Sequence, residues 1–167
     1  MEDIISNLSL RIASEDFNTI LNCDTEKITS LNLQYSFLKE IPDLSKFTKL
    51  TTLNLAINSD IKDFNNISKI TSLENLYLAN NNLHGKMIDF SELTNLKMLG
   101  LANNTLWDQD LKNLKSLKNN TNLTIDLSSN SIIDAKPLLE LNSNTRIRLQ
   151  GNINLSQEAK EQLKTRF

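Results

Sequence analysis

The chain has 167 residues, enough for one domain with a sizeable core, and 39% of them are apolar. Its net charge of −2 gives no reason to expect binding to nucleic acid or to an anionic membrane surface. No apolar stretch approaches the roughly 18 residues that span a membrane, and the acidic start Met1-Glu2-Asp3 argues against a secretory signal.

Residues 1–27 carry two short apolar patterns with helical spacing. The first contains Ile4, Ile5, Leu8 and Ile12, and the second begins after Ser14, a helix-capping residue type, with Phe17, Ile20 and Leu21. We expect this segment, which includes Cys23, to form a helical cap over the first of the repeats that follow.

Residues 28–155 contain six copies of the pattern L-x-x-L-x-L-x-x-N, in a chain with 30 leucines and 24 asparagines. The fourth positions stand 22 to 26 residues apart and are Leu31, Leu53, Leu76, Leu99, Ile125 and Ile147. Side chains alternate along an extended segment, so the fourth and sixth positions point into a core. The pattern predicts parallel strands that include residues 31–33, 53–55, 76–78, 99–101, 125–127 and 147–149.

The second half of each repeat has apolar residues three apart, as in Leu38, Ile41, Leu44 and Phe47. This spacing predicts a short 3₁₀ or irregular helical return. Together the two halves resemble the short-repeat subclass of leucine-rich repeat proteins that includes internalins and the SDS22-type regulator of phosphatase 1. The resemblance implies an α/β fold: a right-handed solenoid with a parallel concave sheet and a convex side of 3₁₀ and short helical segments.

The ninth position of the repeat is polar throughout. It is Ser36 in the first repeat and then Asn58, Asn81, Asn104, Asn130 and Asn152. A solvated turn asparagine is the alternative, but the constant register predicts a buried ladder of amides bonded to the main chain.

Besides Ser36 at the first ladder position, two departures from the pattern affect the expected structure. Asn122 and Asn144 replace the apolar first residue, so the register of the last two repeats is left open. The fourth repeat is longer, and Asp108 and Asp110 precede Leu111, Leu114 and Leu117, which predicts capping of an α-helical turn or two. We expect His84 to be an exposed turn residue.

Residues 156–167 form the last predicted element. Ser156 precedes Ala159, Leu163 and Phe167, which are spaced by four as on one face of a helix. The sequence therefore predicts a single domain with a helical cap over residues 1–27, six repeats over 28–155 and a capping helix over 156–167.

No catalytic motif occurs, and with one cysteine and one histidine the chain can form neither an internal disulfide nor a multi-cysteine or multi-histidine metal site. We expect a cytoplasmic monomer without cofactor or metal that binds a protein partner through the concave face and flanking loops. The alternatives are an immunity-type inhibitor of an enzyme or toxin, a secreted host-interaction protein, and an ordinary solvated sheet face.

The candidate contact residues are Tyr35, Ile57, Tyr77, Met98, Asp126, Arg146 and Arg148. Trp107 either packs within the longer repeat or joins this surface.

Overall fold

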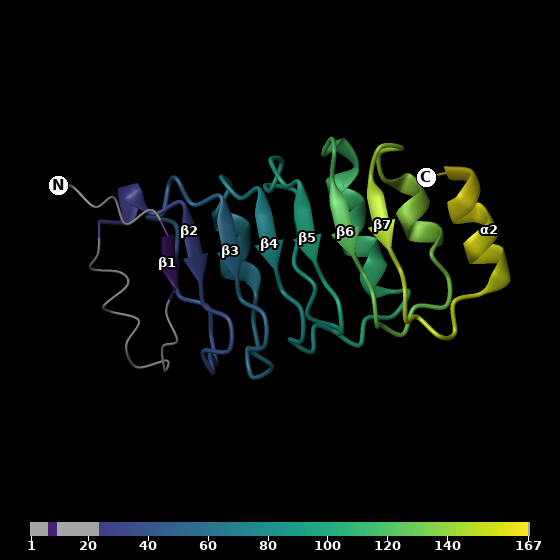
Figure 1. The fold of residues 1–167 in the computed structure, drawn as a ribbon, viewed down its shortest axis with the longest axis horizontal. Helices are drawn as coiled ribbons and strands as arrows, with labels where there is room; N and C mark the ends of the chain where they lie inside the picture. The colour runs from purple at the N-terminus through teal and green to yellow at the C-terminus, as the bar shows by residue number, and fades with distance from the viewer. Residues whose placement is uncertain (1–6, 10–23, 167) are drawn as a thin grey trace.

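A computed structural model describes residues 7–9 and 24–166. Seven short strands form one parallel sheet in chain order, as Figure 1 shows. They are β1 (Asn7–Ser9), β2 (Ser30–Asn32), β3 (Thr52–Asn54), β4 (Asn75–Tyr77), β5 (Met98–Gly100), β6 (Thr124–Asp126) and β7 (Arg146–Arg148). The sheet confirms the predicted leucine-rich repeat solenoid, and each of the six predicted strands begins and ends one residue earlier than expected.

The return segments are mainly 3₁₀ helices. They are η1 (Thr25–Lys27), η2 (Asn65–Lys69), η3 (Asp110–Asn119) and η4 (Lys136–Glu140), and the α-helix α2 (Gln157–Arg166) follows the last strand. Neighbouring strands pair position for position, so that Leu31 faces Leu53 and Ile125 faces Ile147.

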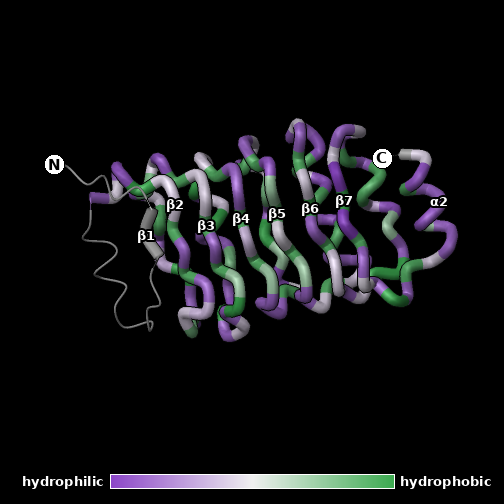
Figure 2. Tube along the Cα trace, viewed as in Figure 1, coloured by the Kyte–Doolittle hydropathy of each residue, from purple (hydrophilic) through white to green (hydrophobic). Residues whose placement is uncertain are grey.

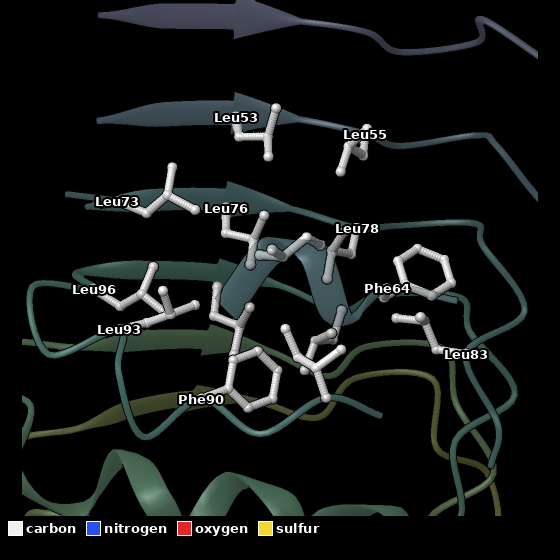
Figure 3. Packing of buried hydrophobic residues seen from close by; sticks show 14 of the residues in the cluster. Leu53, Leu55, Phe64, Leu73, Leu76, Leu78, Leu83, Phe90, Leu93 and Leu96 are labelled. Atoms are coloured by element: carbon white, nitrogen blue, oxygen red, sulfur yellow. The ribbon is translucent and has the colours of Figure 1, made fainter. Parts of the chain in front are cut away.

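The core consists of columns of equivalent residues from successive repeats. In Figure 3, Leu53 and Leu76 stack at the fourth position, Leu55 and Leu78 stack at the sixth, and all four are essentially inaccessible to solvent. Phe64 is one of the buried residues that the return segments contribute to the core. Each such side chain stabilises the fold by about 1.5–3 kcal/mol through burial, and Figure 2 shows the resulting apolar segments recurring along successive coils.

The prediction of helix around Leu8 was wrong. Residues Asn7–Ser9 form β1 and pair in parallel with β2, with Leu8 opposite Leu31. A single apolar residue fits a strand as well as a helix, and the backbone groups on the open edge of β2 favour the strand. The remaining cap residues of the prediction, together with Cys23, lie outside the described residues.

The longer fourth repeat also differs from its prediction. The segment Asp110–Asn119 is a 3₁₀ helix, not an α-helix. Leu111, Leu114 and Leu117 are all buried, and their spacing of three keeps them on one face only at 3.0 residues per turn. The apolar spacing therefore selects the tighter helix.

The last two repeats keep the common register despite their asparagines. Asn122 is exposed with a φ of 57°, and the adjacent Leu123 is buried. In the last repeat Thr145 is likewise buried beside the exposed Asn144. The chain thus buries the second position of these repeats instead of the first.

Helix α2 continues the row of return segments at the C-terminal end. The Ser156 hydroxyl oxygen accepts a hydrogen bond of 3.1 Å from the Ala159 N–H, and Ala159 is buried. Lys136 of η4 lies 3.6 Å from Glu158 of α2, and the carboxylates of Asp134 and Glu158 raise the pKa of Lys136. Within the described ranges, no helix has the length and apolar character needed to cross a membrane.

Candidate functional site

The asparagine ladder fixes the turns from which the candidate surface projects. The Asn104 amide nitrogen donates to the carbonyls of Leu78, at 2.8 Å, and Leu101, at 3.1 Å. Its oxygen accepts from the Asn81 N–H at 2.7 Å. The same set of bonds recurs along the solenoid, and Ser36 and all five ladder asparagines are buried. The predicted ladder is confirmed.

The residue before each ladder position adopts a left-handed backbone. The values of φ lie between 55° and 79° at Tyr35, Ile57, Asn80, Asn103, Ser129 and Gly151. The N–H groups of Tyr35 and Ile57 each donate at 2.9 Å to a carbonyl of the next repeat, which holds this conformation. These two candidate residues therefore lie in the turns beyond β2 and β3, not on the strands.

The polar part of the concave face is largely bonded to itself. At the fifth position, Asn32, Asn54 and Asp126 accept the N–H of the residue two further along, at 3.0–3.1 Å. Side chains also bond between neighbouring repeats, in the pairs Asn54 with Gln34, Asn75 with Thr52, and Asn103 with Asn80. These bonds leave fewer polar groups free for a partner than the sequence suggests.

Tyr77 packs against the sheet instead of joining Tyr35. A Cβ added at Gly100 would lie 3.3 Å from Cδ1 of Tyr77, so the ring rests over the glycine of β5. Strand β5 lies on the side of β4 away from Tyr35, which pairs with Phe37 at 4.7 Å between ring centroids. Met98, also on β5, is half-buried.

The last two strands carry the charged end of the concave face. Nη1 of Arg148 lies 4.0 Å from Oδ2 of Asp126, and Arg146 is exposed. The structure thus brings Asp126 and Arg148 together, and the Asp126 carboxylate also accepts a hydrogen bond from the Ser128 N–H. An exposed pair at this distance contributes little to stability.

The exposed large apolar side chains gather along one edge of the solenoid. Among the described residues they are Tyr35, Phe37, Ile57, Trp107, Ile133 and Ile153, with exposed fractions between 40% and 90%. Every one follows the carboxyl end of a strand, from Tyr35 three residues beyond Asn32 to Trp107 seven residues beyond Gly100. We call this edge, defined by these six residues, the rim.

Two carboxylates organise the centre of the rim. Asp110 is 4% exposed and accepts the N–H groups of Gly85 and Trp107 at 2.9 and 2.8 Å. Its Oδ2 lies 2.8 Å from Nδ1 of His84, whose ring stacks on Trp107 with centroids 5.2 Å apart. His84 thus lies in a turn, as predicted, but it is half-buried instead of fully exposed.

The predicted capping role of the two aspartates was also wrong. Asp108 accepts the N–H groups of Ile133 and Asp134, at 2.8 and 3.0 Å, from the next repeat. Asp110 bonds to the preceding repeat, and no side chain caps η3. The two carboxylates link neighbouring turns of the rim.

Three rim residues, Ile133, Ile153 and Phe37, were not predicted from the sequence, and Phe37 is the aromatic one among them. At 63% exposure it is more accessible than Tyr35, yet it follows the ladder position and so lies beyond the strand pattern. An aromatic residue directly after the ladder position is the signal that identifies it. Its φ of 53° turns it away from the core.

The parallel sheet, the 3₁₀ returns and the asparagine ladder define a leucine-rich repeat protein of the internalin-like type. The fold is similar to that of internalin C2 from Listeria monocytogenes, with 26% identity and a TM-score of 0.59 over 75% of this chain and 53% of that one. It is also similar to internalin InlF from the same organism, with 29% identity and a TM-score of 0.53 over 74% and 35% of the two chains.

A third similar structure is the functional domain of InlJ from Listeria monocytogenes, at 17% identity and a TM-score of 0.50, which shows the fold alone. That domain includes a cysteine ladder, whereas the ladder here is made of asparagine. No protein-family model matches the sequence, and no curated protein matches it. The chain spans about half the length of the internalin C2 structure and about a third of the InlF structure. The likeness to internalins supports a protein-interaction module in general terms.

Proposed function

We propose that this chain is a non-enzymatic module that binds a protein partner through the rim together with the concave face. The observation that carries the proposal is the one-sided placement of exposed apolar side chains. All six large ones among the described residues follow strand ends, and none lies on the return segments. Apolar and aromatic side chains gathered in this way are typical of interaction surfaces.

The size of the sheet supports a role for the rim. Seven strands at about 4.8 Å spacing and a width of about 16 Å give roughly 450 Å² of projected concave surface. A standard interface buries roughly 800 Å² on each partner. A partner that lay on the concave face alone would therefore fall short, and the adjoining rim supplies further apolar surface.

The backbone at Ile57 gives independent support. A β-branched residue with a φ of 60° is energetically unfavourable, and Asn and Gly occupy the equivalent left-handed positions in other repeats at lower cost. The Ile57 side chain is 40% exposed, so burial in the core does not offset this cost. Contact with a partner would explain an isoleucine at this position.

Affinity capture from native lysate, with the partner quantified by mass spectrometry, tests the proposal. The rim variants are Tyr35→Asn, since asparagine tolerates the left-handed turn, and Trp107→Ala. The concave variant is Arg148→Ala, and the control on the exposed convex side is Lys118→Ala. Each variant is first shown to be folded by circular dichroism.

We expect one protein to be retained by wild type and by Lys118→Ala, and to bind the rim variants about thirtyfold more weakly. Arg148→Ala should have a smaller effect because its ion pair is exposed. A partner that binds both rim variants as tightly as wild type would contradict the proposal.

A further inference from the structure

The backbone bonds between strands leave an open edge at β7. In each earlier repeat the sixth-position N–H donates to the next strand, as Leu127 does to the Arg148 carbonyl at 2.8 Å. The eighth-position N–H does the same, as Ser129 does to Gln150 at 2.7 Å. The equivalent donors of the last repeat are Leu149 and Gly151, and no strand follows β7 among the described residues.

The core is also incompletely covered beside β7. Ile147 and Leu149 are half-buried, whereas their counterparts in the preceding repeat are fully buried. Helix α2 packs against η4 at the C-terminal end of the solenoid (Figure 1), so it covers the convex half of the last repeat. A hollow remains between β7 and α2, lined by Ile147, Leu149, Gln150, Leu155, Lys160, Leu163 and Lys164.

A second hollow at the start of β7 contains an unsatisfied polar group. Thr145 is 2% exposed, and its hydroxyl is the one buried side-chain oxygen or nitrogen in the described part of the chain without a hydrogen-bond partner. It lines this hollow beside Arg146 and Ile147. A buried hydroxyl without a partner is unfavourable, and a bonding group in the hollow would relieve this cost.

The charges around the two hollows define the chemistry of the occupant. Arg146, Lys160 and Lys164 line them, and no acidic side chain does so among the described residues. Lys164 pairs with Glu161 at 3.1 Å, whereas Arg146 and Lys160 have no ion-pair partner within the described part. A second copy of the chain would bring equal positive charges together, so the edge favours an acidic partner.

We propose that the open edge of β7 binds an extended acidic segment of a protein partner, which adds to the sheet as a further strand. Carbonyls two residues apart in that segment accept from Leu149 and Gly151. Alternate side chains of the segment are apolar and cover Ile147 and Leu149, while those on the other face are acidic and lie beside Arg146. This site adjoins the rim at Gly151, two residues before Ile153, but it uses backbone pairing at the sheet edge instead of the exposed rim side chains.

Strand β6 provides the sequence for a peptide that probes the open edge of β7. Residues 122–130 include β6, which pairs in parallel with the other edge of β7 and places Asp126 opposite Arg148. The probe is a labelled peptide of this sequence with Thr124→Glu, which puts a second carboxylate opposite Arg146 in the same register. The matched control peptide carries lysine at both positions, so that it keeps the apolar pattern and reverses the charge.

Binding is followed by fluorescence anisotropy, and hydrogen exchange at individual amides is followed by NMR. We expect the acidic peptide to slow exchange at Leu149 and Gly151, which exchange faster in the free protein than Leu127 and Ser129. Arg146→Glu should weaken binding by at least about fivefold, and the distant, exposed Lys118→Glu should leave it unchanged. The lysine peptide should bind as weakly to wild type as the acidic peptide binds to Arg146→Glu.

Three results would overturn the proposal. The first is no saturable binding of the acidic peptide, and the second is binding that leaves exchange at Leu149 and Gly151 unchanged. The third is a dimer of the free protein, seen by sedimentation, in which these amides are already protected. Because neither variant changes one of the six rim side chains, failure of this assay would leave the proposed function of the rim intact.

Discussion

Replacing Asn104 by alanine should remove about 3 kcal/mol from the free energy of unfolding. The side chain is fully buried, and its loss leaves the Asn81 N–H unpaired. It also removes one of the two amide donors to the Leu78 carbonyl, which keeps the bond from the Asn81 amide. Each buried backbone group left unpaired costs about 1–3 kcal/mol. With a urea m-value of about 3 kcal/mol per M, the unfolding midpoint should fall by about 1 M.

The matched control for this measurement is Asn95→Ala. The Asn95 side chain is exposed and makes one hydrogen bond, of 3.1 Å, to the Thr71 carbonyl. The same chemical change at this site should cost less than about 1 kcal/mol. Equal urea midpoints for Asn104→Ala and Asn95→Ala, measured by circular dichroism, would refute the energetic role of the ladder.

Asn104→Asp separates the donor role of the amide from its size. An aspartate oxygen would face the Leu78 and Leu101 carbonyls where the amide nitrogen now donates. Burial and these acceptors disfavour the charged form, so the pKa of the introduced carboxyl should be higher in the folded state than in the unfolded state. The variant should therefore lose stability relative to wild type as the pH rises from about 4 to 7, and a difference independent of pH would contradict this reasoning.

Gly151→Ala should be more costly than Gly85→Ala, although both glycines have positive φ values, of 79° and 68°. A Cβ at position 151 would lie 2.8 Å from the Ser129 hydroxyl oxygen, whereas one at position 85 would meet nothing within 4 Å. We therefore expect Gly151→Ala to lower the free energy of unfolding in urea by about 2–3 kcal/mol and Gly85→Ala to lower it by about 1 kcal/mol. Leu163→Asp should cost about 2 kcal/mol by the same assay because half-buried Leu163 packs on the core, while exposed Lys164→Asp should cost less than about 1 kcal/mol. Equal effects within either pair would show that the local contacts are not responsible.

The sequence predicts the strands and the ladder well because both recur with the repeat. The apolar fourth and sixth positions can pack only if neighbouring repeats align, so strand centres such as Leu76 and Leu99 follow directly from the period. Asn81 and Asn104 are buried for the same reason. The first strand carries no repeat signature, and β1 was therefore not predicted.

The geometry of the candidate site is less predictable, since it depends on contacts between repeats. His84 and Asp110 stand 26 residues apart in the sequence, and no local pattern connects them. Tyr77 lies against the sheet because Gly100 is its neighbour on β5, which the sequence shows only once the register is known. The left-handed backbone of the turns likewise cannot be predicted from the alternation of side chains along a strand.

The ladder explains why the exposed apolar residues lie on the rim. Each ladder amide is buried and bonds to the main chain of the turns, and the residue before it adopts a left-handed backbone that places the ladder side chain in the core. This geometry directs Tyr35 and Ile57 outward at the strand ends, where no other repeat can cover them. The concave face, by contrast, satisfies its asparagines through bonds along and across strands. The element that stabilises the solenoid therefore also displays its apolar side chains on one edge, where a flat or convex partner surface can reach several repeats at once.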